Sequence, residues 1–174
     1  MEDNKYSRED AYQSLEMVNS WINNVDSKIS YILAFIGVII GFVFIQGTPK
    51  AFANISQADE ITCRMLLESI LVVLLYIASF LAIVFLVLAI IARTQFQTSK
   101  RSAFFFGTIA NEEKNSYVER VTKMSEKEII EDILGQVHIN SGICLRKMKL
   151  YNIGITFFTI SIILCFICMI FHLL

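Results

Sequence analysis

The sequence predicts an all-α integral membrane protein with three transmembrane helices and a small cytoplasmic helical bundle formed by extensions of the membrane helices. Of the 174 residues, 55% are hydrophobic and only 18% are charged, whereas an average soluble domain carries about 25% charged residues. Three uncharged runs, residues 29–45, 69–92 and 151–174, account for the excess. The chain has a single proline, which argues against a turn-rich β architecture.

The lengths of the three runs match the thickness of a bilayer. At about 1.5 Å rise per residue, the second and third runs each reach about 36 Å, which exceeds a hydrocarbon core of about 30 Å. The first run reaches about 26 Å and needs Gln46, Gly47 or local thinning of the bilayer to complete the crossing. A backbone in lipid must satisfy its own hydrogen bonds, so these runs are expected to be helices. We therefore predict spans at 29–46, 69–92 and 151–174.

The basic residues are distributed unevenly among the segments outside the spans. Three of them lie in residues 1–28, two in 47–68 and ten in 93–150. Because positive charge accumulates on the cytoplasmic side, segments 1–28 and 93–150 are expected inside. Segment 47–68 is then an external loop, and the C-terminus is external.

The segments outside the spans carry helical signals of their own. Before the first span, apolar residues recur every three or four positions, and they are Leu15, Val18, Ile22, Val25 and Ile29. This spacing predicts an amphipathic helix that runs directly into the span. Ser7 with Asp10 resembles a capping box at the start of this helix.

Segment 93–150 is expected to contain a loop and two helices. Residues 94–111 show no period and are predicted to form a loop against the membrane. A short helix is marked by Tyr117, Val118, Val121 and Met124. Ser125 followed by Glu128 is a capping box that predicts the start of a longer helix, which continues into the third span.

No residue pattern points to catalysis, to a metal or to a resident cofactor. Cys165 and Cys168 have C-x-x-C spacing but lie inside a span, where a reactive thiolate is not expected. His138 and His172 are expected on opposite sides of the membrane, so they cannot share a metal. The sequence contains neither a nucleophile elbow nor a phosphate-binding loop. We therefore expect that the protein is not an enzyme.

The predicted spans are poor in the groups that line an ion pathway. Their interiors contain no Asp, Glu, Lys, Arg or His, and ionisable residues inside a span usually mark a route for ions. Three plain helices cannot enclose an aqueous lumen, so passage of ions would require several copies, and a homo-oligomer is expected. Gly37 and Gly41 form a G-x-x-x-G motif in the first span, which allows close helix packing. That packing is expected either within one chain or between copies, and the sequence leaves both open.

Two basic groups flank the membrane on the predicted inner side. The first contains Arg93, Lys100 and Arg101, and the second contains Arg146, Lys147 and Lys149. Such groups commonly set topology and contact anionic lipid, and the alternative is that they hold a nucleotide phosphate. No basic groove with interleaved aromatic residues is evident, so nucleic acid is not an expected partner.

Two short stretches carry a more specific signal. The first is WINNVDSKISYILAFIG at 21–37, in which Asp26 and Lys28 precede the span. The second is SAFFFGTI at 102–109, followed by Tyr117 and by a helix that carries Lys147 and Lys149 into the last span. Over nearly the whole chain, these features resemble the bacterial Pycsar effector family of membrane proteins.

The resemblance implies a function, a ligand and a location. Members of the family act in antiphage defence at the inner membrane, where a partner cyclase makes a cyclic pyrimidine mononucleotide and the effector then impairs the membrane. On the family pattern, and with Arg101 added from the basic groups, the candidate ligand-binding residues are Asp26, Lys28, Arg101, Phe106, Gly107, Lys147 and Lys149. Asp26 could instead pair with a basic residue at the membrane face, and Gly107 could allow a tight turn.

Two other functions are compatible with the same residues. A membrane-anchored adaptor or structural subunit would dock a soluble partner and conduct nothing, in keeping with spans that lack ionisable groups. A holin-like protein would form pores without any ligand. The lipid bilayer is an expected partner in all three cases.

Overall fold

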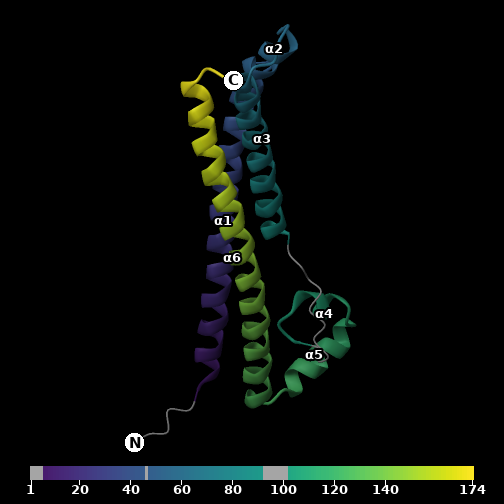
Figure 1. The fold of residues 1–174 in the computed structure, drawn as a ribbon. Helices are drawn as coiled ribbons and strands as arrows, with labels where there is room; N and C mark the ends of the chain where they lie inside the picture. The colour runs from purple at the N-terminus through teal and green to yellow at the C-terminus, as the bar shows by residue number, and fades with distance from the viewer. Residues whose placement is uncertain (1–5, 46, 92–101) are drawn as a thin grey trace, which may run out of the picture. The chain divides into compact units, whose positions relative to one another are not determined.

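The computed structural model describes residues 6–45, 47–91 and 102–174, and within them the chain is helical with no strand. The helices are α1 (Arg8–Ile45), α2 (Lys50–Ser56), α3 (Cys63–Ile90), α4 (Phe106–Ala110), α5 (Lys114–Lys123) and α6 (Glu126–Ile170) (Figure 1). By length and composition, α1, α3 and α6 can each cross a membrane. The predicted fold class is confirmed.

The chain divides into two compact units. We call Met1–Asn24 with Ala92–Arg146 the bundle unit, and Val25–Ile91 with Lys147–Leu174 the span unit. Helices α1 and α6 each contribute to both units, because neither helix is interrupted at the division.

Helix α1 is a single helix of 38 residues, as the apolar spacing predicts. It begins with the expected capping box, because the Ser7 amide and hydroxyl both donate to Asp10 Oδ2, at 2.9 and 2.7 Å. In return, the Asp10 amide donates to Ser7 Oγ at 3.1 Å. The backbone and side-chain hydrogen bonds from Ser7 lower the pKa of Asp10 below its ordinary value of 3.8.

This capping box predicts that the first turn of α1 depends on pH. A carboxyl group whose pKa is lower in the folded state stabilises that state above the unfolded pKa, and the contribution is lost as the pH falls through the folded pKa. We expect the first turn to fray below about pH 4, detected by NMR of the Ala11 amide, which donates to Ser7 O in the folded chain. Asp10→Asn should remove this pH dependence, and an unchanged pH profile in the variant would contradict the assignment.

Helix α6 begins at the second predicted capping box. Ser125 donates to Glu128 Oε2 from its amide at 2.8 Å and from its hydroxyl at 2.7 Å. The helix then runs without interruption for 45 residues. It ends in a Schellman-type turn, in which His172 has a positive φ of 53° and the Leu173 amide donates to Cys168 O at 2.9 Å.

In the span unit, α3 and the membrane parts of α1 and α6 pack side by side around an apolar core (Figure 1). Its buried residues are Val25, Ile29, Ile36, Ala82, Leu86, Ala89 and Phe158. Gly154 of α6 lies so close to α3 that a Cβ atom built on it would come within 2.8 Å of Leu86 Cγ. A hydrogen bond of 2.6 Å between the hydroxyls of Ser79 and Ser161 crosses between these helices. The hydroxyls of Ser30, Thr156 and Thr159 instead donate to carbonyls of their own helices.

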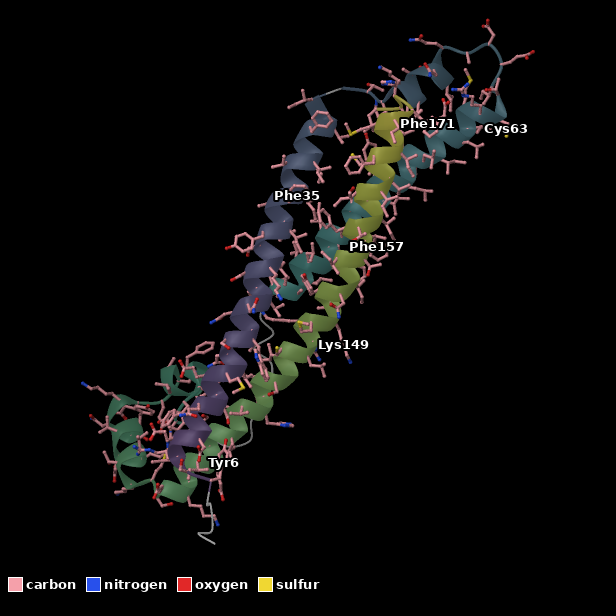
Figure 2. All side chains as sticks on the ribbon, turned by 90° about the vertical axis from the view of Figure 1, so that its left-hand side faces the viewer. Tyr6, Phe35, Cys63, Lys149, Phe157 and Phe171 are labelled. Carbon is pink, nitrogen blue, oxygen red and sulfur yellow. The ribbon has the colours of Figure 1, made fainter. Side chains whose placement is uncertain are left out.

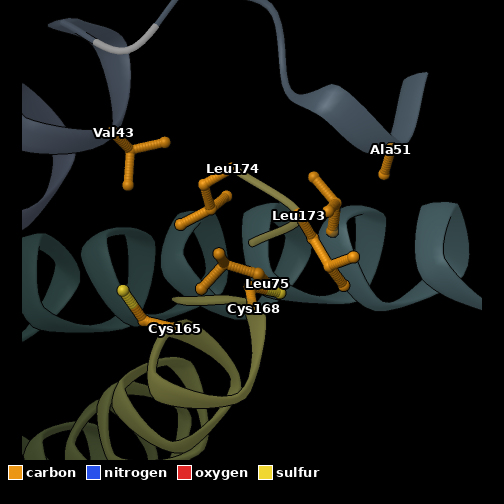
Figure 3. Packing of buried hydrophobic residues seen from close by; sticks show 8 residues of the cluster. Val43, Ala51, Leu75, Cys165, Cys168, Leu173 and Leu174 are labelled. Atoms are coloured by element: carbon orange, nitrogen blue, oxygen red, sulfur yellow. The ribbon is translucent and has the colours of Figure 1, made fainter. Parts of the chain in front are cut away.

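A second apolar cluster closes one end of the span unit. In Figure 3 the terminal leucines, Leu173 and Leu174, lie among Val43, Leu75 and Cys168. The Ala51 amide of α2 donates to Leu173 O at 3.2 Å, and the Ser69 hydroxyl donates to Ala51 O at 3.2 Å. Segment 47–68 therefore contains a short helix that the sequence did not predict, and α3 begins six residues before the uncharged run.

Large apolar side chains project from the outside of the three long helices (Figure 2). Ile45 is 86% exposed and Phe80 is 65% exposed. Contiguous exposure of this kind is not tolerated in a soluble monomer, whereas lipid tails are as apolar as these side chains. The span unit is therefore built to face lipid.

The bundle unit consists of α4, α5 and the first parts of α1 and α6. Ala11, Val18 and Ile133 are buried in it, and the Asn140 amide donates to Asn19 Oδ1 at 2.8 Å. The expectation of a loop over 94–111 is wrong for its second half, because 106–110 form α4. Residues 94–101 lie outside the described residues.

Candidate functional site

The structure brings two of the seven candidate ligand-binding residues together. Asp26 of α1 and Lys147 of α6 both lie in the span unit, where they form an ion pair. Lys28 and Lys149 of the same unit are exposed, and Lys149 is labelled on α6 in Figure 2. Phe106 and Gly107 lie in the bundle unit, and Arg101 lies outside the described residues.

The ion pair joins three segments of the chain through one ammonium group. Lys147 Nζ lies 2.6 Å from Asp26 Oδ1 and 2.8 Å from Asp26 Oδ2, and it donates a longer bond of 3.5 Å to Ile90 O. Ile90 is the last residue of α3, so its carbonyl lies at the negative end of the helix dipole and has no partner within the helix. An ammonium has three donors, and here its acceptors come from α1 and α3, so that Lys147 of α6 connects three helices.

The two charges of the pair differ in exposure. The Lys147 side chain is 8% exposed, whereas that of Asp26 is 37% exposed. A buried charge is strongly disfavoured without a partner, so Asp26 is what allows Lys147 to occupy this position. The alternative role of Asp26, pairing with a basic residue, is therefore the one present here, and the same carboxylate is not free for a ligand in this arrangement.

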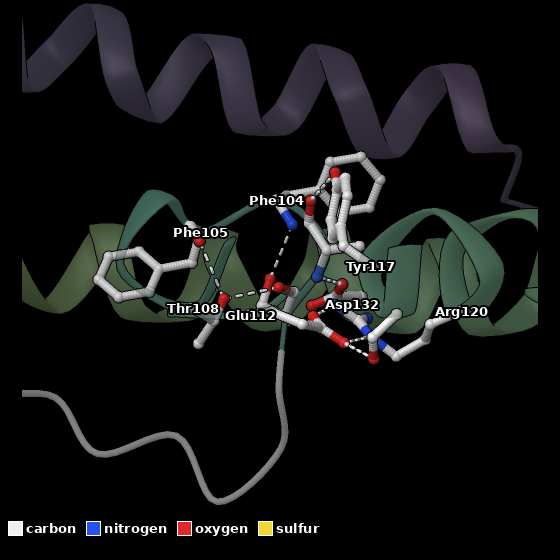
Figure 4. A network of polar contacts seen from close by, with 10 residues as sticks. Phe104, Phe105, Thr108, Glu112, Tyr117, Arg120 and Asp132 are labelled. Carbon is white, nitrogen blue, oxygen red and sulfur yellow. Dashed lines mark hydrogen bonds and ion pairs between the residues drawn. The ribbon is translucent and has the colours of Figure 1, made fainter. Parts of the chain in front are cut away.

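In the bundle unit, a second polar network fixes the chain before α4 (Figure 4). The Ala103 amide donates to Asp132 Oδ2 of α6 at 2.7 Å, and the Tyr117 hydroxyl of α5 donates to Ala103 O at 3.1 Å. Thr108 donates to Ser102 O at 2.6 Å. The ring of Phe104 meets that of Tyr12 edge to face, with centroids 5.8 Å apart. This turn is therefore held by contacts from α1, α4, α5 and α6.

An ion pair links the end of α4 to α5. Arg120 donates to Glu112 Oε2 from Nη2 at 2.7 Å and to Oε1 from Nε at 3.2 Å. The Glu112 side chain is only 3% exposed. Its hydrogen bonds raise the pKa of the Arg120 guanidinium, which also lies over the Tyr117 ring, 5.6 Å from the centroid.

The aromatic segment before α4 explains Gly107. Phe105 and Phe106 contact each other, with centroids 4.8 Å apart, and Phe106 is exposed. A Cβ atom on Gly107 would lie 2.6 Å from Phe105 Cε1, so glycine at this position accommodates the Phe105 ring. The sequence left open a tight turn at Gly107. Gly107 does not have a positive φ, since among the described glycines that conformation belongs to Gly47.

The G-x-x-x-G motif lies on the outside of the span unit. A Cβ atom on Gly37 or Gly41 would meet nothing within 4 Å, so these glycines do not serve close packing against the described helices. Packing against a second copy stays a prediction. Within the described residues, no group of three His, Cys, Asp or Glu side chains is placed to hold a metal ion.

Several residues that shape the site were missed by the sequence analysis. Glu112, Arg120 and Asp132 carried no motif, and Gly154 stood alone in an apolar run. One group could have been found from its spacing, because Lys147, Gly154 and Ser161 follow one another at intervals of seven residues on α6. This spacing places them on one side of a helix that packs against a neighbour.

Three lipid-facing helices joined to a separate helical unit define a multipass membrane protein. Comparison with known proteins gives the family. Residues 10–174 match the family model described as the Pycsar effector protein domain. The chain belongs to the Pycsar effector family, which comprises transmembrane effectors of antiphage defence.

Two relatives are similar over most of their length. The Pycsar effector protein GmPycTM of Gulbenkiania mobilis is 33% identical over 187 residues, covering 93% of each chain. The Pycsar effector protein PtPycTM of Propioniciclava tarda is 27% identical over 174 residues, covering 92% of this chain and 78% of the relative. No solved structure matches the chain.

Proposed function

We propose that this protein is a signal-gated effector of the bacterial inner membrane, which impairs membrane integrity when a cyclic nucleotide is made during phage infection. Membership of the Pycsar effector family over residues 10–174 carries this proposal. Pycsar effectors respond to cyclic nucleotides from a cyclase, and the ligand expected here is a cyclic pyrimidine mononucleotide. The protein itself is not expected to be an enzyme or to need a resident cofactor.

The division of the chain supports a gated mechanism. The span unit has the apolar exterior that lipid requires, and the bundle unit has the charged and hydrogen-bonded groups that a polar ligand requires. The excess of basic residues in 93–150 supports a cytoplasmic bundle unit, with the C-terminus external. Moving a two-state population from 1:99 to 99:1 takes about 5.5 kcal/mol of differential binding, which a charged ligand with a few contacts can supply.

A homo-oligomer is part of the proposal. The described spans present few polar side chains, so a single copy offers little to line a path for ions or water. The outward position of Gly37 and Gly41 supports helix contacts between copies.

Coexpression with the cognate cyclase tests the proposal. We expect the membrane potential, followed with a voltage-sensitive dye, to collapse when the cyclase is stimulated and to persist when a catalytically dead cyclase is present. An intact potential with the active cyclase would contradict the effector function and favour the adaptor. Depolarisation without any cyclase would instead indicate a holin-like protein.

A further inference from the structure

The Asp26–Lys147 pair lies where the chain passes between its two units. The chain crosses from one unit to the other at 24/25, 91/92 and 146/147. Lys147 is the first residue after one crossing, Asp26 is the second after another, and Ile90 is the second before the third. The buried ammonium of Lys147 therefore contacts residues of the span unit that lie within two positions of the other two crossings.

This contact differs from the other polar contacts of the span unit. Arg64 and Glu68 of the same unit also form an ion pair, but it lies within one helix and its arginine is exposed. The cross-helix contact deeper in the unit is the uncharged Ser79–Ser161 hydrogen bond. Asp26 and Lys147 thus supply the charged contact that holds two membrane helices together.

The pair lies beside the packed core of the span unit, an arrangement that we call the closed packing. Ile29, Ala82 and Leu86, in the adjoining core, are fully buried against one another. A state that impairs the membrane must separate some of these helix contacts. Lys147 is neutralised in the closed packing by Asp26, and parting α1 from α6 would leave it without that carboxylate, so the pair favours the closed packing.

We propose that Asp26, Lys147 and the Ile90 carbonyl form a latch that keeps the span unit closed and that activation opens it. The latch rests on the proposed effector function and adds a regulatory contact to it. The more exposed member, Asp26, is the one that water or a competing cation can reach, so the latch opens by loss of the carboxylate from a lysine that stays in place.

The test is depolarisation in the absence of a signal. Lys147→Met and Asp26→Asn, each expressed without cyclase, should raise the depolarised fraction of cells at least tenfold over the wild-type chain, which corresponds to a shift of about 1.4 kcal/mol. Lys50→Met is the matched control, because this lysine belongs to the same unit and is exposed. The double variant Asp26→Lys with Lys147→Asp should restore part of the quiet state, because it pairs the charges again but removes the ammonium of Lys147 from the Ile90 carbonyl.

The outcomes separate the latch from the function on which it rests. Single variants that stay quiet without cyclase, beside a wild-type chain that responds to the cyclase, overturn the latch alone. A wild-type chain that reaches the membrane but does not respond overturns the effector function and the latch with it. If the single variants fail to accumulate, Asp26→Glu keeps the charge while lengthening the side chain, and it should lower the amount of signal needed. An unchanged requirement overturns the latch.

Discussion

Replacing Gly154 with valine is expected to destabilise the span unit by about 3 kcal/mol, at the upper end of what overpacking a core usually costs. A Cβ atom at this position would lie 2.8 Å from Leu86 Cγ, 2.9 Å from Leu86 Cδ2 and 3.3 Å from the Leu86 amide nitrogen. The side chain of Leu86 is fully buried and the amide belongs to the backbone of α3. Because neither can move freely, α3 and α6 must separate.

The prediction is checked by thermal unfolding of the purified protein in detergent. Gly142→Val is the matched control, because Gly142 lies on the same helix and a Cβ atom on it would meet nothing within 4 Å, and its midpoint should stay close to that of the wild type. Adding Leu86→Ala to Gly154→Val should recover part of the loss by making room. Equal destabilisation by the two glycine variants would show that helix propensity, rather than contact with Leu86, sets the cost.

The role of Gly154 belongs to a wider pattern along α6. Residues at intervals of seven face the packed side of this helix in both units, and they are Ile133, Asn140, Lys147, Gly154, Ser161 and Cys168. Three of them make polar contacts with another helix: Asn140 with Asn19, Lys147 with Asp26, and Ser161 with Ser79. In membranes, helix interfaces favour small and polar residues, since the lipid-facing positions can be as apolar as a core.

This pattern explains which parts of the fold could be predicted. The spans followed from uninterrupted apolar runs, and the starts of α1 and α6 followed from Ser7–Asp10 and Ser125–Glu128, since both signals are local. The packed faces of the spans could not be found by apolar periodicity, because large apolar residues lie on every side of α3 and α6. The G-x-x-x-G motif therefore pointed to Gly37 and Gly41, which face outward, whereas the closely packed glycine is Gly154.

The candidate site was predictable to a similar extent. A pairing of Asp26 with a basic residue at the membrane face was one of the two roles that the sequence left open for it, the other being ligand binding. Which of Arg146, Lys147 and Lys149 meets Asp26 depends on how α6 is rotated about its own axis. That rotation is set by the side of α6 that packs against the other helices. The anchoring of Ala103 by Asp132 joins residues 29 apart in the chain, and no local signal specifies such a contact.

Replacing Arg120 with methionine is expected to destabilise the bundle unit by about 3 kcal/mol, because removing one partner of a buried ion pair strands the other charge in a poorly hydrated place. The Arg120 side chain is 27% exposed, but the Glu112 carboxylate that it binds at two oxygens is almost fully buried. The variant also loses the contact of the guanidinium with the Tyr117 ring. Tyr117 in turn bonds Ala103 O, so the loss should spread to the turn before α4.

Amide hydrogen exchange checks this prediction at the level of each unit. Protection should fall across 102–124 and remain unchanged in α3, since the affected contacts all lie in the bundle unit. Lys123→Met is the matched control, because Lys123 forms an exposed pair with Glu119 in the same helix, and such pairs contribute about 0.3–0.5 kcal/mol. Arg120→Lys keeps the charge without the two-pronged geometry and should fall between the two. If Arg120→Met and Lys123→Met change exchange equally, the buried pair does not hold α4 to α5, and the order of this unit must come from Asp132 and the aromatic contacts instead.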